Sequence, residues 1–330
     1  MNYNLGVMAS HDCHKIFTAY KMTESDYKKY IKFGTSTWTY EGWVGTVYNR
    51  PYTKSNFKKT CLEEYAEYPY FSTVGIDHTF YGPANDDILS RYASLLPNGF
   101  ECCSKVWERL TIPKYAKNKR YGKLAGEVNE DYLNADLFNN TVLPPYERSF
   151  QGRTGPFIFQ FQTQYPERAQ NGNRDSSARL REAFSEKLNG FLSRLRTNFR
   201  YAVEVRNREF LTPEYFQMLA SHNVAHVFNH WTHMPSIGEQ LAIEGSITAD
   251  HIVARILTPL GIAYKQAVDN FFPYNEVKKP METMRRDVAD LAKKAINLKK
   301  KAYAIVNNRA EGNAPGTIAA IDAMIRKDIE

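Results

Sequence analysis

Short apolar runs that recur along the chain constrain its fold more than any other feature of the sequence. Each run has the length of a β-strand, and longer amphipathic windows separate most of them. Strands that alternate with helices favour parallel pairing through right-handed crossovers. The predicted strands cover residues 32–36, 72–77, 100–105, 156–161, 201–205, 225–228, 252–256 and 302–306.

The windows between these strands carry apolar residues three and four positions apart, which is the spacing of one helix face. Thr212 followed by Pro213 is typical of a helix start, because threonine caps the free backbone N–H groups and proline suits the first turn. The predicted helices cover residues 55–67, 84–96, 178–197, 213–222, 281–299 and 316–327.

An α/β chain with this element order closes most economically as one (β/α)8 TIM-like barrel, which takes roughly 250 residues before insertions. A doubly wound open sheet is the alternative, but no GxGxxG or GxxxxGK[ST] motif follows any predicted strand. We predict a barrel domain at 31–330 and an N-terminal extension at 1–30. A long insertion after strand three, at 106–155, is rich in glycine and proline and forms either a lid or a surface decoration.

The chain has a net charge of +7 and a pI of about 9.0, which favours acidic partners such as phosphates or nucleic acid. The densest group of lysines, at 293–301, is better explained as the solvated face of an amphipathic helix. The four cysteines form no CxxC pair, which indicates reduced thiols. Because no apolar run approaches the ~20 residues of a membrane span, we expect a cytoplasmic protein without a membrane partner.

Five sequence blocks occur in the order of a known family. They read FGTSTWTYEGWVGTVY at 33–48, FSTVGIDHTFYGPA at 71–84, GPFIFQFQ at 155–162, YAVEVRNREF at 201–210 and VNNRAEGNAP at 306–315. Together they resemble the domain-of-unknown-function-72 family, the YecE-like proteins. The resemblance implies a TIM-like barrel and no settled activity.

The sequence departs from that family's pattern at three positions. Gly75 stands where the second-strand motif places an acidic residue, Leu257 where the seventh-strand motif places histidine, and Arg309 where aspartate follows the last Asn-Asn. Chemistry that needs those ionisable groups is therefore put in question, and a non-catalytic binding protein becomes one alternative.

Functional residues of a barrel lie at the C-terminal ends of its strands. Glu204 is the strongest candidate, because a carboxylate inside the apolar run YAVEV is costly unless it has a partner or a task. It is either a general base or anchor, or half of a structural ion pair with Arg255 or Arg206. Arg255 carries the same argument with the opposite sign and suits a phosphate or carboxylate.

Three further residues complete the predicted catalytic set: Asp77 and His78 as an acid–base pair, and Lys105 as a partner in catalysis or an anion clamp. A divalent metal held by Asp77, His78, Glu204 and His230 is a disfavoured alternative, because no HxH, HExxH or CxxC spacing is present. The predicted ligand-binding residues are Ser36, Trp38, Tyr81, Gln160, Arg206, Asn229, Arg255, Asn307 and Asn308.

The first strand is followed by a loop rich in aromatic residues, Trp38, Tyr40, Trp43 and Tyr48. These rings either form a stacking wall for a ligand or fasten the loop to the barrel rim, and the second interpretation is slightly favoured. The sequence thus predicts a pocket for a small polar or phosphorylated ligand, with metal-assisted hydrolysis or isomerisation as the leading reaction class by analogy of fold. A barrel that binds or processes nucleic acid is the second hypothesis.

Overall fold

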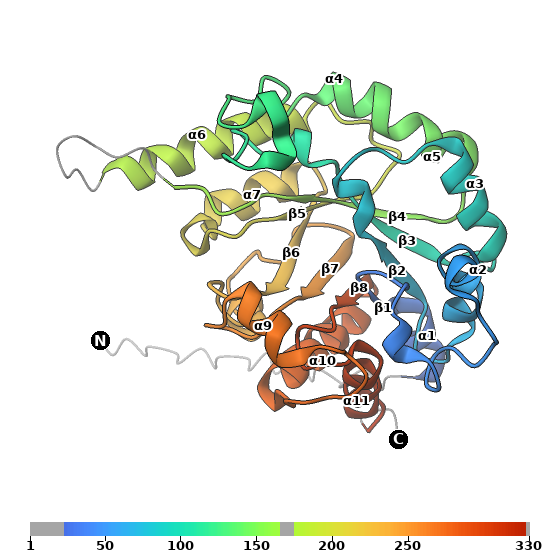
Figure 1. The fold of residues 1–330 in the computed structure, drawn as a ribbon. Coiled ribbons are helices and arrows are strands. Elements are labelled where there is room, and N and C mark those ends of the chain that lie inside the picture. Colours follow the sequence, from blue (N-terminus) through green and yellow to red (C-terminus); the bar gives the residue numbers. More distant parts are fainter. Residues whose placement is uncertain (1–22, 166–174, 328–330) are drawn as a thin grey trace, which may run out of the picture.

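The computed structural model describes residues 23–165 and 175–327, and its centre is a sheet of eight parallel strands in the order β1-β8-β7-β6-β5-β4-β3-β2 (Figure 1). The strands are β1 Ile31–Thr35, β2 Thr73–Ile76, β3 Glu101–Lys105, β4 Thr154–Gln160, β5 Tyr201–Glu204, β6 Ala225–His230, β7 His251–Ile256 and β8 Lys301–Val306. Each pair of neighbours in this order is parallel. The predicted α/β fold, a TIM-like barrel, is confirmed.

The two outermost strands of this order, β1 and β2, meet at a seam. The Ser72 N–H donates to the Phe33 carbonyl oxygen at 2.8 Å across it. A Cβ atom on Gly34 would lie 1.9 Å from the Thr73 carbonyl oxygen, and one on Gly75 would lie 3.2 Å from the backbone of Ser36. Gly75, where the YecE-like pattern carries an acidic side chain, therefore lets the two strands approach closely.

Helices surround the strands (Figure 1), and the helix predicted after Thr212 begins with the expected cap. Thr212 accepts from the Tyr215 N–H at 3.3 Å, and Pro213 opens the helix as predicted. The α-helices are α1 Glu24–Tyr30, α2 Lys54–Glu67, α3 Asp86–Leu95, α4 Ala135–Leu137, α5 Leu143–Ser149, α6 Asp175–Leu192, α7 Pro213–Ser221, α8 Ile237–Leu241, α9 Tyr264–Phe271, α10 Glu282–Asn297 and α11 Ala314–Arg326. Short helical turns are η1 Glu41–Trp43, η2 Asp77–Phe80, η3 Glu108–Leu110, η4 Lys119–Leu124, η5 Phe138–Val142 and η6 Arg208–Phe210.

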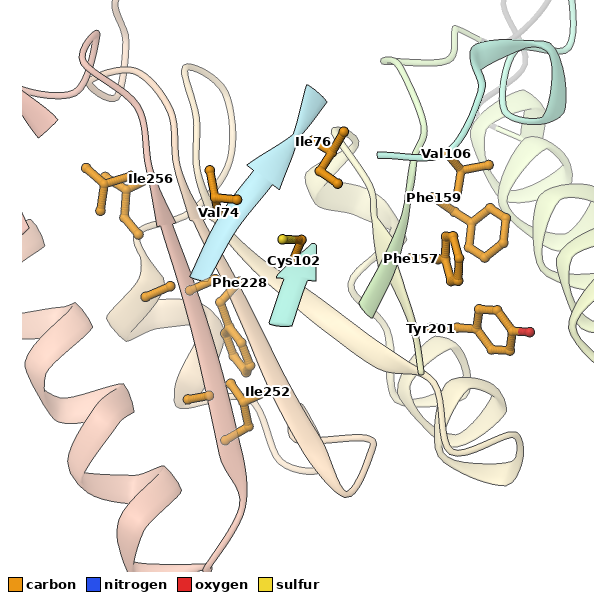
Figure 2. Close-up of a cluster of buried hydrophobic side chains, with 14 of the residues drawn as sticks. Val74, Ile76, Cys102, Val106, Phe157, Phe159, Tyr201, Phe228, Ile252 and Ile256 are labelled. Atoms are coloured by element: carbon orange, nitrogen blue, oxygen red, sulfur yellow. The ribbon is translucent and has the colours of Figure 1, made fainter. Parts of the chain in front are cut away.

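Apolar side chains fill two layers, one between the strands and the helices and one inside the barrel. Figure 2 shows part of the outer layer, where Phe157 and Phe159 of β4 lie close to Tyr201 of β5. The alternation of strand side chains separates the adjacent Cys102 and Cys103, which belong to the outer and the inner layer respectively. Both are free thiols, as is Cys61, while Cys13 lies outside the described residues.

The insertion predicted at 106–155 is present between β3 and β4 but contains more helix than its glycine and proline content suggests. Helix α5 packs against α3, and its Tyr146 hydroxyl donates to Ser104 Oγ at 2.9 Å. Most of the predicted N-terminal extension, residues 1–22, lies outside the described residues, whereas 24–30 form α1 against α10 and β1. Within the described ranges, no helix is long and apolar enough to cross a membrane.

Closure of the seam predicts that Gly34→Ala destabilises the fold by about 3 kcal/mol or more, because two backbone segments would have to separate. Gly190→Ala, on an exposed face of α6 with no atom near the new methyl group, is the matched control and should be neutral or stabilising by about 0.5–1 kcal/mol. Urea unfolding of both variants measures the difference. Equal stabilities would show that β1 and β2 need no close contact.

Candidate functional site

A pocket of about 470 Å³ opens at the C-terminal ends of the strands. This volume falls in the range typical of small-molecule sites, which is roughly 300–1,000 Å³. The pocket is lined by Asp77, His78, Phe80, Tyr81, Lys105, Arg120, Gln160, Gln162, Arg206, Trp231, Arg255, Leu257, Thr258, Tyr264, Asn307 and Arg309.

Arg255 organises the floor of the pocket, and only 2% of this residue is exposed to solvent. Its Nη1 donates to Glu204 Oε2 at 2.6 Å and to Gln160 Oε1 at 3.1 Å, and its Nη2 donates to Asp77 Oδ2 at 2.9 Å. Strand register sets this arrangement, since Gln160 is aligned with Glu204 between β4 and β5, facing the same side of the sheet. The floor therefore links four segments of the barrel through one arginine.

Arg206, two residues after Glu204 at the end of β5, also binds Glu204 and Gln160. Its Nε lies 3.3 Å from Glu204 Oε1, and its Nη2 donates to Gln160 Oε1 at 2.9 Å. Burial by itself would raise the pKa of the Glu204 carboxyl, but attraction to Arg255 and Arg206 outweighs burial and lowers the pKa. Glu204 is therefore held as a carboxylate, with both oxygens directed to arginines.

Four cationic groups of the pocket lie over aromatic rings. Lys105 Nζ is 3.6 Å from the Phe80 ring centre, and the Arg206 guanidinium is 4.6 Å from that of Trp231. Arg309 lies 4.6 Å over Tyr264 and Arg120 lies 5.7 Å over Tyr81. Ring faces attract guanidinium and ammonium groups, so these rings position the basic side chains at the pocket wall.

The pocket carries a surplus of positive charge. Lys105, Arg120, Arg206, Arg255 and Arg309 line it, whereas Asp77 is the sole acidic lining residue among the residues that the structure describes. The carboxylates of Glu204 and Glu108 bind Arg255 and Arg120 from behind the lining. Burial lowers the pKa of Lys105 to about 7, with Arg255 and Arg206 adding to the effect and Asp77 opposing it. This crowding of cations suits an anionic ligand.

The structure brings most of the predicted site residues into the pocket lining: Asp77, His78, Lys105, Tyr81, Gln160, Arg206, Arg255 and Asn307. Glu204 is completely buried and lies outside the lining. Its contacts correspond to the ion-pair alternative of the sequence prediction, in which it positions the arginines.

The other predicted ligand-binding residues lie outside the lining, because packing or local hydrogen bonds occupy them. Trp38 is buried with its ring edge-on to His78 and Tyr92. Asn229 Nδ2 donates to the Val205 carbonyl oxygen at 2.8 Å. Asn308 Oδ1 accepts from the Ala314 N–H at 2.8 Å, which fastens the last loop to α11. Ser36 is buried beside the β1–β2 seam.

The aromatic first loop also packs inward. Trp43 and Tyr48 are fully buried, their rings stack, and the Tyr48 hydroxyl donates to the Trp38 carbonyl oxygen. These rings fasten the loop, and the rings that line the pocket come from other loops.

Sequence reasoning missed Arg120, Trp231, Tyr264 and Arg309 as lining residues. Arg120 belongs to the insertion and Tyr264 begins α9, so no strand pattern pointed to either. Arg309 had a visible signal, since a basic residue replaces the aspartate of the YecE-like pattern directly after Asn307–Asn308.

Within residues 23–165 and 175–327, no three His, Cys, Asp or Glu side chains are grouped to hold a metal ion. Asp77 is bound by Arg255, and His230 lies outside the pocket lining, where burial lowers its pKa to about 4. The set Asp77, His78, Glu204 and His230 therefore does not assemble as metal ligands.

The ion pairs predict that Glu204→Gln destabilises the protein by about 3–5 kcal/mol at neutral pH, since the buried Arg255 and the partly buried Arg206 lose the carboxylate that they share and only Asp77 is left to pair with Arg255. A carboxyl whose pKa is lowered by folding stabilises above its unfolded-state pKa and loses that contribution as pH falls through its folded-state pKa. Urea unfolding against pH should therefore show a weaker acid dependence in the variant. Glu182→Gln, on the exposed side of α6, is the control. Equal stability of both variants would contradict the ion-pair role.

Comparison with known proteins places this geometry in a family. Two crystal structures of a DUF72 family protein from Enterococcus faecalis V583 match at 15% identity with TM-scores of 0.56 and 0.55, covering 90% and 91% of this chain and 98% and 95% of theirs. A DUF72 family protein from Thermotoga maritima MSB8 matches at 19% identity with a TM-score of 0.57, covering 90% of this chain and 99% of the other. No curated protein matches. The model of the family described as "Protein of unknown function DUF72" matches residues 32–330, and the chain therefore belongs to the DUF72 family.

Proposed function

We propose that the barrel binds a small phosphorylated or otherwise anionic metabolite in the pocket at its C-terminal strand ends. The observation that carries this proposal is the convergence of five cationic side chains on one volume of about 470 Å³. Guanidinium groups bind phosphate and carboxylate oxygens through paired, charge-assisted hydrogen bonds. The carboxylates of Glu204, Asp77 and Glu108 offset only part of this positive charge, so the binding of an anion is favourable.

The floor and the rim have different tasks in this proposal. Arg255 and Arg206 are fixed by Glu204 and Gln160, so they present ordered donors at little entropic cost. Arg309 and Arg120 come from the loop after β8 and from the insertion, and they enclose the ligand from the rim. Tyr81 is 69% exposed and offers a ring face at the mouth to an apolar or planar part of the ligand.

The lining supports an organic ligand whose anionic group is bound by arginine, with Lys105, Asp77 and His78 as the groups able to take part in chemistry. We do not assign metal-assisted hydrolysis or isomerisation, because the described residues bring no set of metal ligands together.

Nucleic acid is the second candidate partner, supported by the +7 charge and the cation–ring pairs. The limited pocket volume favours a small ligand over a polymer. Titration with a single-stranded oligonucleotide at low and moderate salt separates the two, because phosphate-backbone binding falls steeply with salt.

Removal of a rim cation should weaken anion binding. We expect Arg309→Met to bind sulfate about 10-fold to 100-fold more weakly than the wild type, as the loss of a hydrogen bond to a charged group implies. Isothermal titration calorimetry measures this affinity. Arg286→Met removes the same charge from an exposed position on α10 and should bind as the wild type does. If both variants lose affinity equally, the effect is net charge and the pocket is not the site.

Anion binding should also depend on the protonation of Lys105. Sulfate keeps both charges across the neutral range, whereas the Lys105 pKa of about 7 means that its charge is present below that pH and lost above it. We expect sulfate affinity to fall roughly tenfold as pH rises from one unit below to one unit above 7. Lys105→Met should abolish most of this change. The same pH profile in both proteins would refute a role for Lys105 in anion binding.

A further inference from the structure

The amine of Lys105 occupies an unusual position for a partly buried lysine. Lys105 ends β3 and faces into the pocket, where its Nζ lies over the Phe80 ring at 3.6 Å. In the described part of the chain, this amine makes no hydrogen bond or ion pair, whereas Arg255 and Arg206 bind Glu204 close by. The carboxylates of the floor therefore bind arginines, and the amine of Lys105 is available to react with a ligand.

Burial in the pocket disfavours the protonated form of Lys105. Burial is the largest effect on its pKa; Asp77 of η2 and Glu204 of β5 oppose it, Arg255 of β7 and Arg206 beyond β5 add to it, and the resulting pKa is about 7. An exposed lysine has a pKa of about 10.4, so at neutral pH only about one amine in a thousand is unprotonated. A large share of Lys105 is therefore a neutral amine, the nucleophilic form of the group.

We propose that Lys105 forms an imine with the carbonyl carbon of an aldehyde or ketone that carries a phosphate or similar anionic group. The inference rests on the proposed function, because the anion-binding arginines must hold the ligand while its carbonyl carbon meets the amine. The ligand class is thereby narrowed from any small anion to an anionic carbonyl compound.

The step balances without a further reactant. The lone pair of Nζ attacks the carbonyl carbon and forms the C–N bond, while the C=O π electrons move to oxygen and the amine proton is transferred to it, giving a carbinolamine. That oxygen takes a proton from an acidic group of the pocket and leaves as water as the C=N bond forms, and the nitrogen then returns its remaining proton to that group. Amine and carbonyl therefore give imine and water, with no oxidation or reduction.

Two titratable side chains of the lining can carry out these proton transfers. Asp77 is partly exposed and bound to Arg255, and His78 follows it in η2. Burial lowers the pKa of His78, so its ring is mostly neutral at pH 7 and able to accept a proton. Once protonated, an imine draws electrons from the neighbouring carbon, which favours removal of a proton or cleavage of a bond at that carbon.

Reductive trapping tests the proposal with the full chain. The protein is incubated at pH 7 with glycolaldehyde phosphate and sodium cyanoborohydride, and the reduced adducts are located by peptide mass spectrometry. We expect Lys105 to be modified at least about tenfold faster than the exposed lysines, which serve as internal references, because far more of its amine is neutral. Sulfate should slow the labelling of Lys105 alone, and unphosphorylated glycolaldehyde should label it more slowly.

Lys105→Arg keeps a cation but has no amine that forms an imine under these conditions, so the fast adduct should disappear, while Lys123→Arg, at an exposed position of η4, should retain it. Thermal unfolding confirms that both variants are folded. Labelling spread evenly over surface lysines would overturn the inference. Sulfate binding separates this failure from that of the proposed function: binding without a Lys105 adduct overturns the imine alone, whereas a fast adduct that sulfate does not slow overturns the anion pocket.

Discussion

The guanidinium of Arg255, buried between the carboxylates of Glu204 and Asp77, is the contact on which the pocket depends. An unpaired charge at this depth costs several kcal/mol, so the arginine requires its acceptors and the acceptors require the arginine. It joins β7 to β5, with β6 between them, and to the turn after β2, which is at the far end of the strand order. The arrangement forms only when the barrel is closed, and it fixes the pocket floor when it does.

The apolar layer beneath this floor strengthens the same contacts. Cys103, Ile158, Val227 and Val253 fill the barrel interior and exclude water from it. Coulomb interactions are stronger in such surroundings, and loss of water disfavours a charge that has no partner. Attraction to Arg255 and Arg206 lowers the pKa of Glu204 against the effect of burial, whereas burial itself is the main cause that lowers the pKa of Lys105. The same surroundings thus keep a paired carboxylate charged and leave an unpaired lysine partly neutral.

The sequence predicted the strands well because apolar runs and barrel geometry are both local and repetitive. From these strands the rule of C-terminal ends correctly located Asp77, Lys105, Gln160, Arg206 and Arg255 in one pocket lining. The same rule could not distinguish lining residues from residues whose side chains are occupied elsewhere. Trp38 and Asn308 also follow strand ends, yet Trp38 packs edge-on against Tyr92 in the core and Asn308 fastens a loop. Arg120, Trp231 and Tyr264 lay beyond the reach of periodicity, since loops after strands bring them to the rim.

The three departures from the YecE-like pattern affect different parts of the structure. Gly75 lies at the seam, where a side chain would meet the backbone of Ser36, and it concerns closure of the barrel. Leu257 and Arg309 line the pocket, so they concern the ligand. An aspartate at 309 would add a second acidic group to a lining that has Asp77 alone, whereas arginine adds a fifth cation to it. The chain therefore lacks the ionisable groups of the pattern without having an inert pocket: its floor is kept by Arg255 and Glu204, while its rim has gained positive charge. In the proposed function this rim binds the anionic part of a ligand, and Lys105, which no carboxylate of the described residues binds, carries the chemistry.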